Sequence, residues 1–229
     1  MAQQYLSMDP NALPQDPGKM ILVDKPLNWT SFDVVKKLKY HLKVKKIGHA
    51  GTLDPLATGL LILCTGKMTK QIEKYQAQEK EYTGKFIIGK TTASFDLETA
   101  VEEVASVNHL DENKITEATQ KFIGRIEQVP PLFSAVKVDG QRAYKIARKG
   151  EDVKLKSRSV SISEFQITKI NLPEVYFLIK CSKGTYIRSL ARDFGKELGV
   201  GAYLGELRRT KVGEYTVEEA HTLEELLLE

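Results

Sequence analysis

Residues 47–63 read I-G-H-A-G-T-L-D-P-L-A-T-G-L-L-I-L, so a polar, glycine-rich segment runs directly into an apolar one. Glycine permits backbone conformations and close approaches that a Cβ atom would obstruct. Pro55 disfavours helical backbone at the preceding residue, Asp54, and moves it towards an extended conformation. The stretch therefore predicts a loop that presents polar groups from a buried strand and restrains the position of the Asp54 carboxylate.

The chain has 229 residues, of which 41% are hydrophobic, and this composition supports a substantial core and excludes a wholly disordered protein. Its longest aliphatic run, residues 60–63, is far too short to span a bilayer, and no signal-like apolar core lies near the first residue. We therefore expect a cytoplasmic protein. Residues 1–19 are polar and contain three prolines, which predicts an irregular N-terminal arm.

No metal site or cofactor is expected from the sequence. Cys64 and Cys181 each end an apolar, strand-like segment and form no C-x-x-C pair, which favours buried small hydrophobic residues. The histidines lack the spacing of metal ligands, which argues against a zinc centre. They are His41, His49, His109 and His221.

The net charge is only +4, but the positive charges are clustered. Residues 36–46 contain six lysines, and residues 137–158 contain eight Lys or Arg against three acidic residues. Such asymmetry is typical of a surface that faces a polyanion, although a solvated helix face explains it equally well. In the second zone we expect phosphate contacts from Lys145, Arg148 and Lys149.

Hydrophobic periodicity switches between strand-like and helix-like segments without a strict β-α-β alternation. Strands are predicted at residues 20–23, 60–64, 81–88, 133–138, 159–170, 175–181 and 204–209. Helices are predicted after Ser31, which we expect to be an N-cap, and at residues 67–75, 113–122, 141–148, 185–198 and in the acidic segment up to residue 229. This order favours an α+β fold with a mixed, mostly antiparallel sheet flanked by helices and loops.

Asp54 is the only carboxylate in the glycine-rich loop, which argues against glycoside hydrolysis by paired carboxylates and favours nucleophilic or single-base chemistry. A carboxylate removed from water needs a cation to remain ionised. Arg188, one turn into the helix predicted at residues 185–198, is the candidate. A turn-forming Asp-Pro pair and an ordinary surface arginine are the alternatives.

Four further residues are candidates for contacts with a nucleic acid. Tyr82 and Tyr186 are able to stack on an extruded base, although a core tyrosine is the simpler interpretation of each. His49 is a candidate wedge or proton carrier, or an unremarkable loop histidine. Lys25 is placed to hold a phosphate or the loop itself, or is merely solvated.

The segment H-A-G-T-L-D-P-L-A-T-G-L-L, residues 49–61, resembles the catalytic signature H-x-G-T-L-D-P-x-A-x-G-x-L of the TruB family of tRNA pseudouridine synthases. Further blocks resemble the family in the same order along the chain. They are D-K-P-L-N-W-T-S at 24–31, K-E-Y-T-G at 80–84, V-P-P-L-F-S-A-V-K-V-D-G-Q-R-A-Y at 129–144, K-G-T-Y-I-R-S-L-A-R-D at 183–193 and Y-L-G-E-L-R-R-T at 203–210.

The resemblance implies the pseudouridine synthase fold and isomerisation of the tRNA T-loop uridine, position 55, to pseudouridine without a cofactor or metal. It implies that Asp54 is the catalytic aspartate, that Arg188 pairs with it, and that Tyr82 stacks on the flipped base and assists proton transfer. His49 matches the histidine that enters the RNA loop. Lys25, Leu207 and Tyr186 are expected near the pocket.

The resemblance also implies one catalytic domain over residues 20–229, with an RNA-binding insertion near residues 130–158 and no separate PUA domain. The expected partner is the tRNA T-arm, bound by a monomer without an obligatory protein partner. Asn28 stands where the family commonly has glycine, and asparagine tolerates the left-handed backbone better than most residues. Two alternatives remain: a tRNA-binding or tRNA-folding chaperone, and a guide-RNA-dependent pseudouridine synthase subunit.

Overall fold

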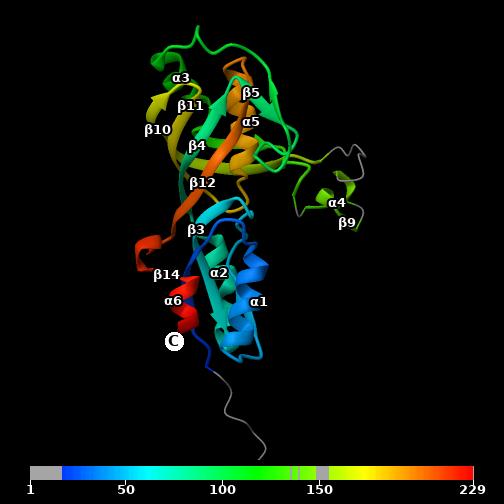
Figure 1. The fold of residues 1–229 in the computed structure, drawn as a ribbon, viewed down its shortest axis with the longest axis vertical. Coiled ribbons are helices and arrows are strands. Elements are labelled where there is room, and N and C mark those ends of the chain that lie inside the picture. Colours follow the sequence, from blue (N-terminus) through cyan, green and yellow to red (C-terminus); the bar gives the residue numbers. More distant parts are fainter. Residues whose placement is uncertain (1–16, 135, 139, 148–154, 229) are drawn as a thin grey trace, which may run out of the picture.

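A computed structural model of the protein describes residues 17–134, 136–138, 140–147 and 155–228. Over these residues it is an elongated body through which one long, twisted sheet runs (Figure 1). The half drawn uppermost in Figure 1 contains β4, β10, β11, β12 and α5, and the lower half contains β3, α1, α2 and α6. No helix in the described part of the chain is long and apolar enough to cross a membrane.

Ten strands of the described residues form the main sheet, and two small pairs stand apart from it. The strands are β1 Met20–Lys25, β2 Ile47–His49, β3 Ala57–Thr65, β4 Lys80–Ile88, β5 Lys90–Thr92, β6 Val101–Glu103, β7 Gly124–Gln128, β8 Lys137–Val138, β9 Gln141–Arg142, β10 Arg158–Asn171, β11 Glu174–Cys181, β12 Ala202–Val212, β13 Tyr215–Thr216 and β14 His221–Thr222. The α-helices are α1 Ser31–His41, α2 Ile72–Ala77, α3 Glu112–Thr119, α4 Ala143–Ala147, α5 Ile187–Glu197 and α6 Leu223–Leu228. Short 3-10 turns occupy Gly66–Gln71, Gln120–Phe122 and Val217–Glu219.

The sheet is mixed and mostly antiparallel, which confirms the predicted fold class. Its strand order is β14-β1-β3-β12-β4-β11-β10-β7, with β2 added to β3 and β13 to β12. Within the described residues only β1 with β14 and β12 with β3 run parallel. Because β12 lies between β3 and β4, a strand from late in the chain joins the two halves of the sheet.

Helix α1 shows how local sequence begins an element. Thr30, not Ser31 as expected, is the N-cap: its side chain accepts from the Asp33 amide while the Asp33 side chain accepts from the Thr30 amide. This reciprocal capping box satisfies donors that a helix start leaves unpaired. The buried face includes Val34, Val35 and Leu38. Leu42 is the C-cap and is exposed, because the helix has already ended there.

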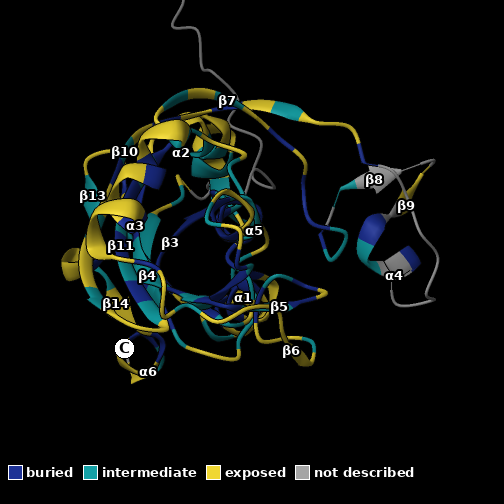
Figure 2. Cartoon of the chain, turned by 90° about the horizontal axis from the view of Figure 1, so that it is seen from above, coloured by how far each residue is buried: buried dark blue, intermediate teal, exposed yellow. Residues whose placement is uncertain are grey.

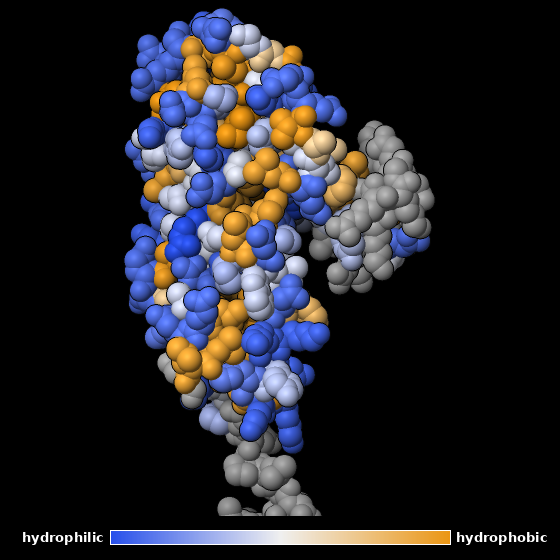
Figure 3. All heavy atoms as spheres, viewed as in Figure 1, coloured by the Kyte–Doolittle hydropathy of each residue, from blue (hydrophilic) through white to orange (hydrophobic). Residues whose placement is uncertain are grey.

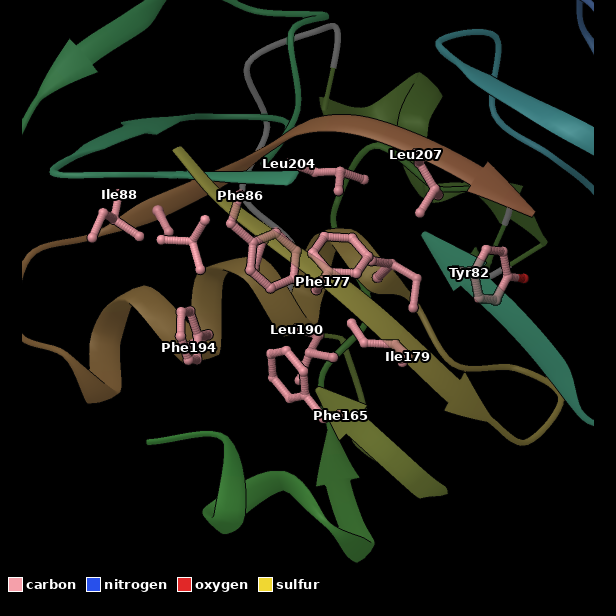
Figure 4. Close-up of a cluster of buried hydrophobic side chains, with 14 of the residues drawn as sticks. Tyr82, Phe86, Ile88, Phe165, Phe177, Ile179, Leu190, Phe194, Leu204 and Leu207 are labelled. Carbon is pink, nitrogen blue, oxygen red and sulfur yellow. The ribbon is translucent and has the colours of Figure 1, made fainter. Parts of the chain in front are cut away.

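The largest core cluster lies in the upper half of the sheet and is rich in phenylalanine (Figure 4). Phe86 on β4 lies 4.4 Å, centroid to centroid, from Phe177 on β11, and 5.7 Å from Phe194 on α5. The helix thus covers the sheet through aromatic contacts that add to area burial. The lower half has mainly aliphatic clusters, in which Val34 and Leu38 of α1 pack with Leu61 and Leu63 of β3.

Several element boundaries differ from expectation. The antiparallel hairpin of β10 and β11 is as predicted. The strand expected at residues 133–138 is wrong apart from the two-residue β8, and the basic helix expected at residues 141–148 is the short α4. Figures 1 and 2 show α4 standing away from the body of the protein, although Ala143 and Ile146 on it are buried. Cys64 and Cys181 are buried and free, as predicted.

Candidate active site

A pocket of about 540 Å³ opens where the two halves of the sheet meet. Residues from four parts of the chain that are distant in sequence line it together. They include Asp54, Tyr82, Leu207 and Arg209, with Tyr186 and Arg188 from the start of α5. The structure therefore brings five of the residues singled out from the sequence into one cavity, and it adds Arg209.

The loop that carries Asp54 is held at both ends by short hydrogen bonds. The Ser31 hydroxyl accepts from the Leu53 amide at 2.8 Å and donates to the Leu53 carbonyl at 3.2 Å. The Asn28 amide donates to the Pro55 carbonyl at 2.9 Å, and Asn28 has φ of 64°. Asparagine thus adopts the left-handed turn expected at this position, and that turn fixes the loop one residue beyond Asp54.

Arg188 is the cation beside Asp54. Its Nε lies 2.9 Å from Asp54 Oδ2, as an ion pair whose N–H is not aligned for a hydrogen bond. Its Nη1 lies 3.4 Å from Asp96 Oδ2 and donates to the Ser94 carbonyl. The Arg188 side chain is only 4% exposed, whereas that of Asp54 is 39% exposed. Arg188 is therefore no ordinary surface arginine: it is buried between two carboxylates, and only Asp54 of the two faces the open pocket.

Burial and the Arg188 cation have opposite effects on the pKa of the Asp54 carboxyl. Desolvation raises the pKa of the Asp54 carboxyl above its usual range, and the Arg188 guanidinium opposes that rise. The negative charges of Asp96 and Glu98 raise this pKa further. Of the groups that act on this pKa, Arg188 opposes the rise most strongly, so its removal would favour the protonated carboxyl.

Tyr82, on β4, also lines the pocket and is buried. Figure 4 shows its ring at the edge of the aromatic cluster, close to Leu207, with the hydroxyl directed away from the cluster. Burial raises the pKa of the Tyr82 hydroxyl, and the neighbouring Arg209 guanidinium opposes the rise. The ring thus combines an apolar support with a hydroxyl beside a cation.

Arg209 is a residue of the pocket that sequence reasoning missed. It is 1% exposed, its Nε donates to the Leu60 carbonyl at 2.7 Å, and its Nη2 donates to the Gly51 carbonyl at 3.2 Å. Its backbone fits against Gly59, where a Cβ would lie 2.3 Å from the Arg209 carbonyl oxygen. Arg209 therefore joins β12 to both sides of the Asp54 loop. The available sequence signal was that successive side chains of a strand point to opposite faces of the sheet. Arg208 therefore lies on the face opposite Arg209, where it pairs with Asp24.

Asp96 was missed as well. It lies outside the blocks that resemble a known family, in a turn-rich segment after β5, and no local pattern distinguishes it from other acidic residues. Its Oδ1 accepts from the Glu98 amide at 2.9 Å, which leaves Oδ2 for Arg188. Asp96 therefore holds the far side of the guanidinium.

Lys25 is fully buried and does not face solvent. Its Nζ donates to the carbonyls of Trp29 at 2.6 Å and Pro26 at 2.8 Å, and more weakly to that of Pro55 at 3.5 Å. Burial lowers the pKa of Lys25 to about 8, although Asp54 opposes the shift. Of the roles considered from sequence, the contacts fit a lysine that holds the loop, and both the phosphate contact and simple solvation are wrong for this conformation.

The remaining candidates lie less close to Asp54. Tyr186 lines the pocket, and the Arg158 guanidinium lies 4.9 Å from its ring centroid. His49 is half-buried on β2, paired with Leu63, and is not among the residues that line the pocket. Burial lowers the pKa of His49. Arg148 and Lys149, and the side chain of Lys145, lie outside the described residues.

Among the residues that the structure describes, no group of three or more His, Cys, Asp or Glu side chains is arranged to hold a metal ion. What the pocket offers is one accessible carboxylate with a fixed cation, a buried tyrosine opposite, and apolar walls from Leu53, Ile187 and Leu207. Such a site suits a flat, largely uncharged ring held beside a nucleophile or a single base.

Comparison with known sequences gives one consistent answer. Residues 39–187 match the TruB family pseudouridylate synthase N-terminal domain, and residues 188–229 match the tRNA pseudouridylate synthase B C-terminal domain. The chain is 55% identical over 210 residues to tRNA pseudouridine synthase B of Flavobacterium johnsoniae, covering 89% of this chain and 92% of that one. It is 52% identical over 213 residues to the protein of the same name from Phocaeicola vulgatus, covering 90% and 91%.

Solved structures agree on the fold. A chain in the crystal structure of a Cbf5-Nop10-Gar1 complex is 31% identical and superposes with a TM-score of 0.70, covering 91% of this chain and 53% of that one. A chain in an H/ACA RNP bound to a substrate RNA containing 2′-deoxyuridine is 29% identical, with a TM-score of 0.68. The chain spans about half the length of these two solved chains.

Proposed function

The chain belongs to the TruB family of pseudouridylate synthases, and on this premise we propose that it isomerises the T-loop uridine of tRNA to pseudouridine. The observation that carries the proposal is the Asp54–Arg188 ion pair, set in a pocket opposite Tyr82. A carboxylate held beside a fixed cation and a buried ring suits a reaction on one extruded base.

In the proposed reaction the uridine leaves its stack and enters the pocket, where Tyr82 supports the uracil ring. The bond from N1 of uracil to C1′ of the ribose breaks, the base rotates, and C5 bonds to C1′. The C5 proton is then removed and N1 gains one, so atoms balance and no oxidant or reductant takes part. Base extrusion costs a few kcal/mol, and stacking contributes ~1–3 kcal/mol towards it.

Asp54 is the group that reacts in this proposal, and Arg188 keeps it ionised. In this proposal Asp54 attacks the sugar C1′, attacks the base, or assists loss of the 2′ proton. Tyr82 is proposed to assist proton transfer at C5, because its hydroxyl lies beside the cationic Arg209. Leu207 and Tyr186 complete the walls that exclude water.

His49 is proposed to enter the RNA loop from outside the pocket, in keeping with its position on β2 rather than beside Asp54. Residues 130–158, which contain α4, are proposed to be an insertion that binds RNA. We further propose that residues 20–229 act as one catalytic unit, since β12 contributes Leu207 and Arg209 to a pocket otherwise built from earlier strands.

The test is pseudouridine formation on unmodified tRNA transcript, mapped by carbodiimide adduct stops, with no other protein present. The wild type is expected to modify the T-loop uridine, and Asp54→Asn to be inactive. Asp193→Asn is the matched control, because Asp193 pairs with Arg192 and does not line the pocket.

Pseudouridine formed by Asp54→Asn, or no pseudouridine formed by the wild type, would contradict the assignment of Asp54 as the catalytic residue. A tRNA-folding chaperone would retain its effect in Asp54→Asn. Activity on the bare transcript would exclude dependence on a guide RNA or a partner protein. A monomer is expected, and light scattering during the same purification would measure it.

A further inference from the structure

The outer face of α1 is unlike the rest of the surface, because large aromatic side chains alternate with lysines along it. Phe32 is 67% exposed and Tyr40 is 87% exposed. Lys36 stands between them at helical spacing, so Phe32, Lys36 and Tyr40 fall on one side of the helix. Lys43 follows just beyond the C-cap, Leu42, and lines the same hollow as Lys36 and Tyr40. This stripe, Phe32-Lys36-Tyr40-Lys43, is called the α1 stripe below.

The charge of α1 is almost entirely positive. Asp33 is its only acidic residue, and the Asp33 carboxylate accepts hydrogen bonds from the Thr30 amide and hydroxyl. Lys37, Lys39 and His41 surround the stripe. The stripe therefore presents cations that α1 itself does not neutralise.

An open hollow of about 1130 Å³ runs along this helix. Its walls include Trp29, Lys36, Tyr40 and Val44, so aromatic rings and lysine stems form most of the lining. Asp33 also lines it, whereas Phe32 lies outside the hollow. A lysine stem covers apolar surface while its ammonium stays in water. The hollow thus combines flat apolar contacts with a charged rim.

The stripe is tied to the catalytic loop. Ser31, the first residue of α1, holds Leu53, and Asn28 at the near end of the hollow holds Pro55. In Figure 1, α1 forms the edge of the lower half on the side towards which α4 projects. The same edge is mostly hydrophilic in Figure 3. Eleven helical residues extend about 16 Å, so a strand that leaves the pocket can continue along the stripe.

We propose that the α1 stripe binds a second, unpaired segment of the RNA whose loop enters the pocket, with bases stacked on Phe32 and Tyr40 and phosphates beside Lys36 and Lys43. The proposal rests on the proposed function and extends the substrate from one loop to a neighbouring strand. Alternating aromatic and cationic groups are the pattern with which proteins hold single strands. An apolar protein partner would instead have to bury four or more uncompensated charges.

The experiment compares two RNAs in binding assays: an isolated T-arm stem-loop and the full-length tRNA transcript. Asp54→Asn is the background, so that binding is measured without turnover. Phe32→Ala/Tyr40→Ala removes the rings, and Lys36→Ala/Lys43→Ala removes the charges. Lys114→Ala/Lys169→Ala is the matched control, because both lysines lie in the other half of the molecule, on α3 and β10.

The ring variant is expected to weaken binding of full-length tRNA about 5-fold or more at every salt concentration, because the bases can no longer stack on the rings. The lysine variant is expected to lower the slope of log Kd against log salt by ~0.7 for each phosphate that is no longer paired with a lysine. Neither variant should change binding of the stem-loop, and the control should change neither RNA.

Equal weakening of both RNAs would place the stripe against the T-loop itself and overturn the second-segment proposal. Unchanged binding of full-length tRNA would overturn it too, and would leave a protein partner as the alternative occupant. Unchanged circular dichroism of both variants would show that they fold. An inactive wild type would count against the proposed function alone, since the binding comparison does not depend on turnover.

Discussion

The pocket and the outer face of α1 are both rich in cations, but the cations are buried and paired in the first region and exposed in the second. In the pocket region Lys25, Arg188 and Arg209 are buried, and each contacts carbonyls or carboxylates of the protein. On α1 the lysines are exposed, and the only acidic residue of the helix is occupied by its N-cap. Cations of the first kind fix the shape of the protein, whereas cations of the second kind are left for a partner.

The energetic reason is desolvation. A buried cation loses its hydration, and protein groups must stabilise it instead. Removal of one partner of a buried ion pair costs ~3–5 kcal/mol. An exposed cation loses little water and contributes ~0–1 kcal/mol to stability. Substitutions in the two regions should therefore differ in size and in what they change.

Arg188→Met is expected to have the largest effect, a fall of about 10²–10³ in kcat, because Asp54 loses the cation that favours its charged form. Since the pKa of Asp54 is already raised by burial, activity should fall as pH drops through that raised pKa, and the variant should move the acid limb to higher pH. The pH dependence of kcat/KM measures this shift.

Arg192→Met is the matched control for Arg188→Met, since Arg192 lies one turn further along α5 and pairs with half-buried Asp193. An acid limb that stays in place in Arg188→Met would mean that Arg188 does not govern ionisation of Asp54.

Arg209→Met is expected to be second, with a decrease of about 2–4 kcal/mol in the free energy of unfolding. The variant leaves the buried Leu60 carbonyl and the partly buried Gly51 carbonyl without this donor, at ~1–3 kcal/mol for a buried group. Urea denaturation measures the decrease. Arg208→Met removes the neighbouring, more exposed arginine and should cost no more than ~1 kcal/mol. Similar decreases in the unfolding free energy of the two variants would contradict the expected difference between a buried and a more exposed arginine.

Lys25→Met should change the pH dependence of stability. The pKa of Lys25 is about 8 in the folded protein and 10.5 in its ordinary state, so between these values the unfolded chain binds more protons. Stability from this group therefore rises as pH increases through the window, and below it the buried charge is a cost. The unfolding free energy of the wild type minus that of the variant should therefore increase from pH 8 to pH 10. A constant difference would mean that Lys25 does not titrate in this window.

Tyr40→Ala is expected to have the smallest effect, within ~0.5 kcal/mol of the wild type in unfolding free energy, because the ring is almost fully exposed. A thermal melt beside that of Phe194→Ala gives the contrast, since removal of a buried phenylalanine costs ~3–5 kcal/mol. A large decrease in Tyr40→Ala would mean that the ring packs on the protein and is not free for RNA.

Much of the fold follows from local pattern. Helices α1 and α5 and the β10–β11 hairpin carry strong periodicity, and the turn at Asn28 follows from backbone preference. The N-cap was misplaced by one residue because Thr30 and Ser31 are both good caps, and only the reciprocal bond with Asp33 distinguishes them.

The site was less accessible from sequence. A lone carboxylate implies a cation, and the structure places Arg188 there. Arg209 and Asp96 could not be found in this way, because their roles depend on the register of β12 against β4 and on a turn that packs against α5. Burial of Lys25 is likewise set by long-range packing, since its partners include the carbonyl of Pro55 in the loop that carries Asp54.

The central place of β12 has a consequence for how the protein is made. Residues 202–212 are synthesised late, yet the strand lies between β3 and β4 and hydrogen-bonds to both. On the ribosome, the earlier strands can form two separate pieces, β1 with β3 and β4 with β11. In the sheet of the described residues β12 joins these pieces, and its pairing with β3 requires residues 207–209. A nascent chain consequently holds Asp54 long before it has Arg209 to fix the loop, so catalytic competence should arise in one late step of synthesis.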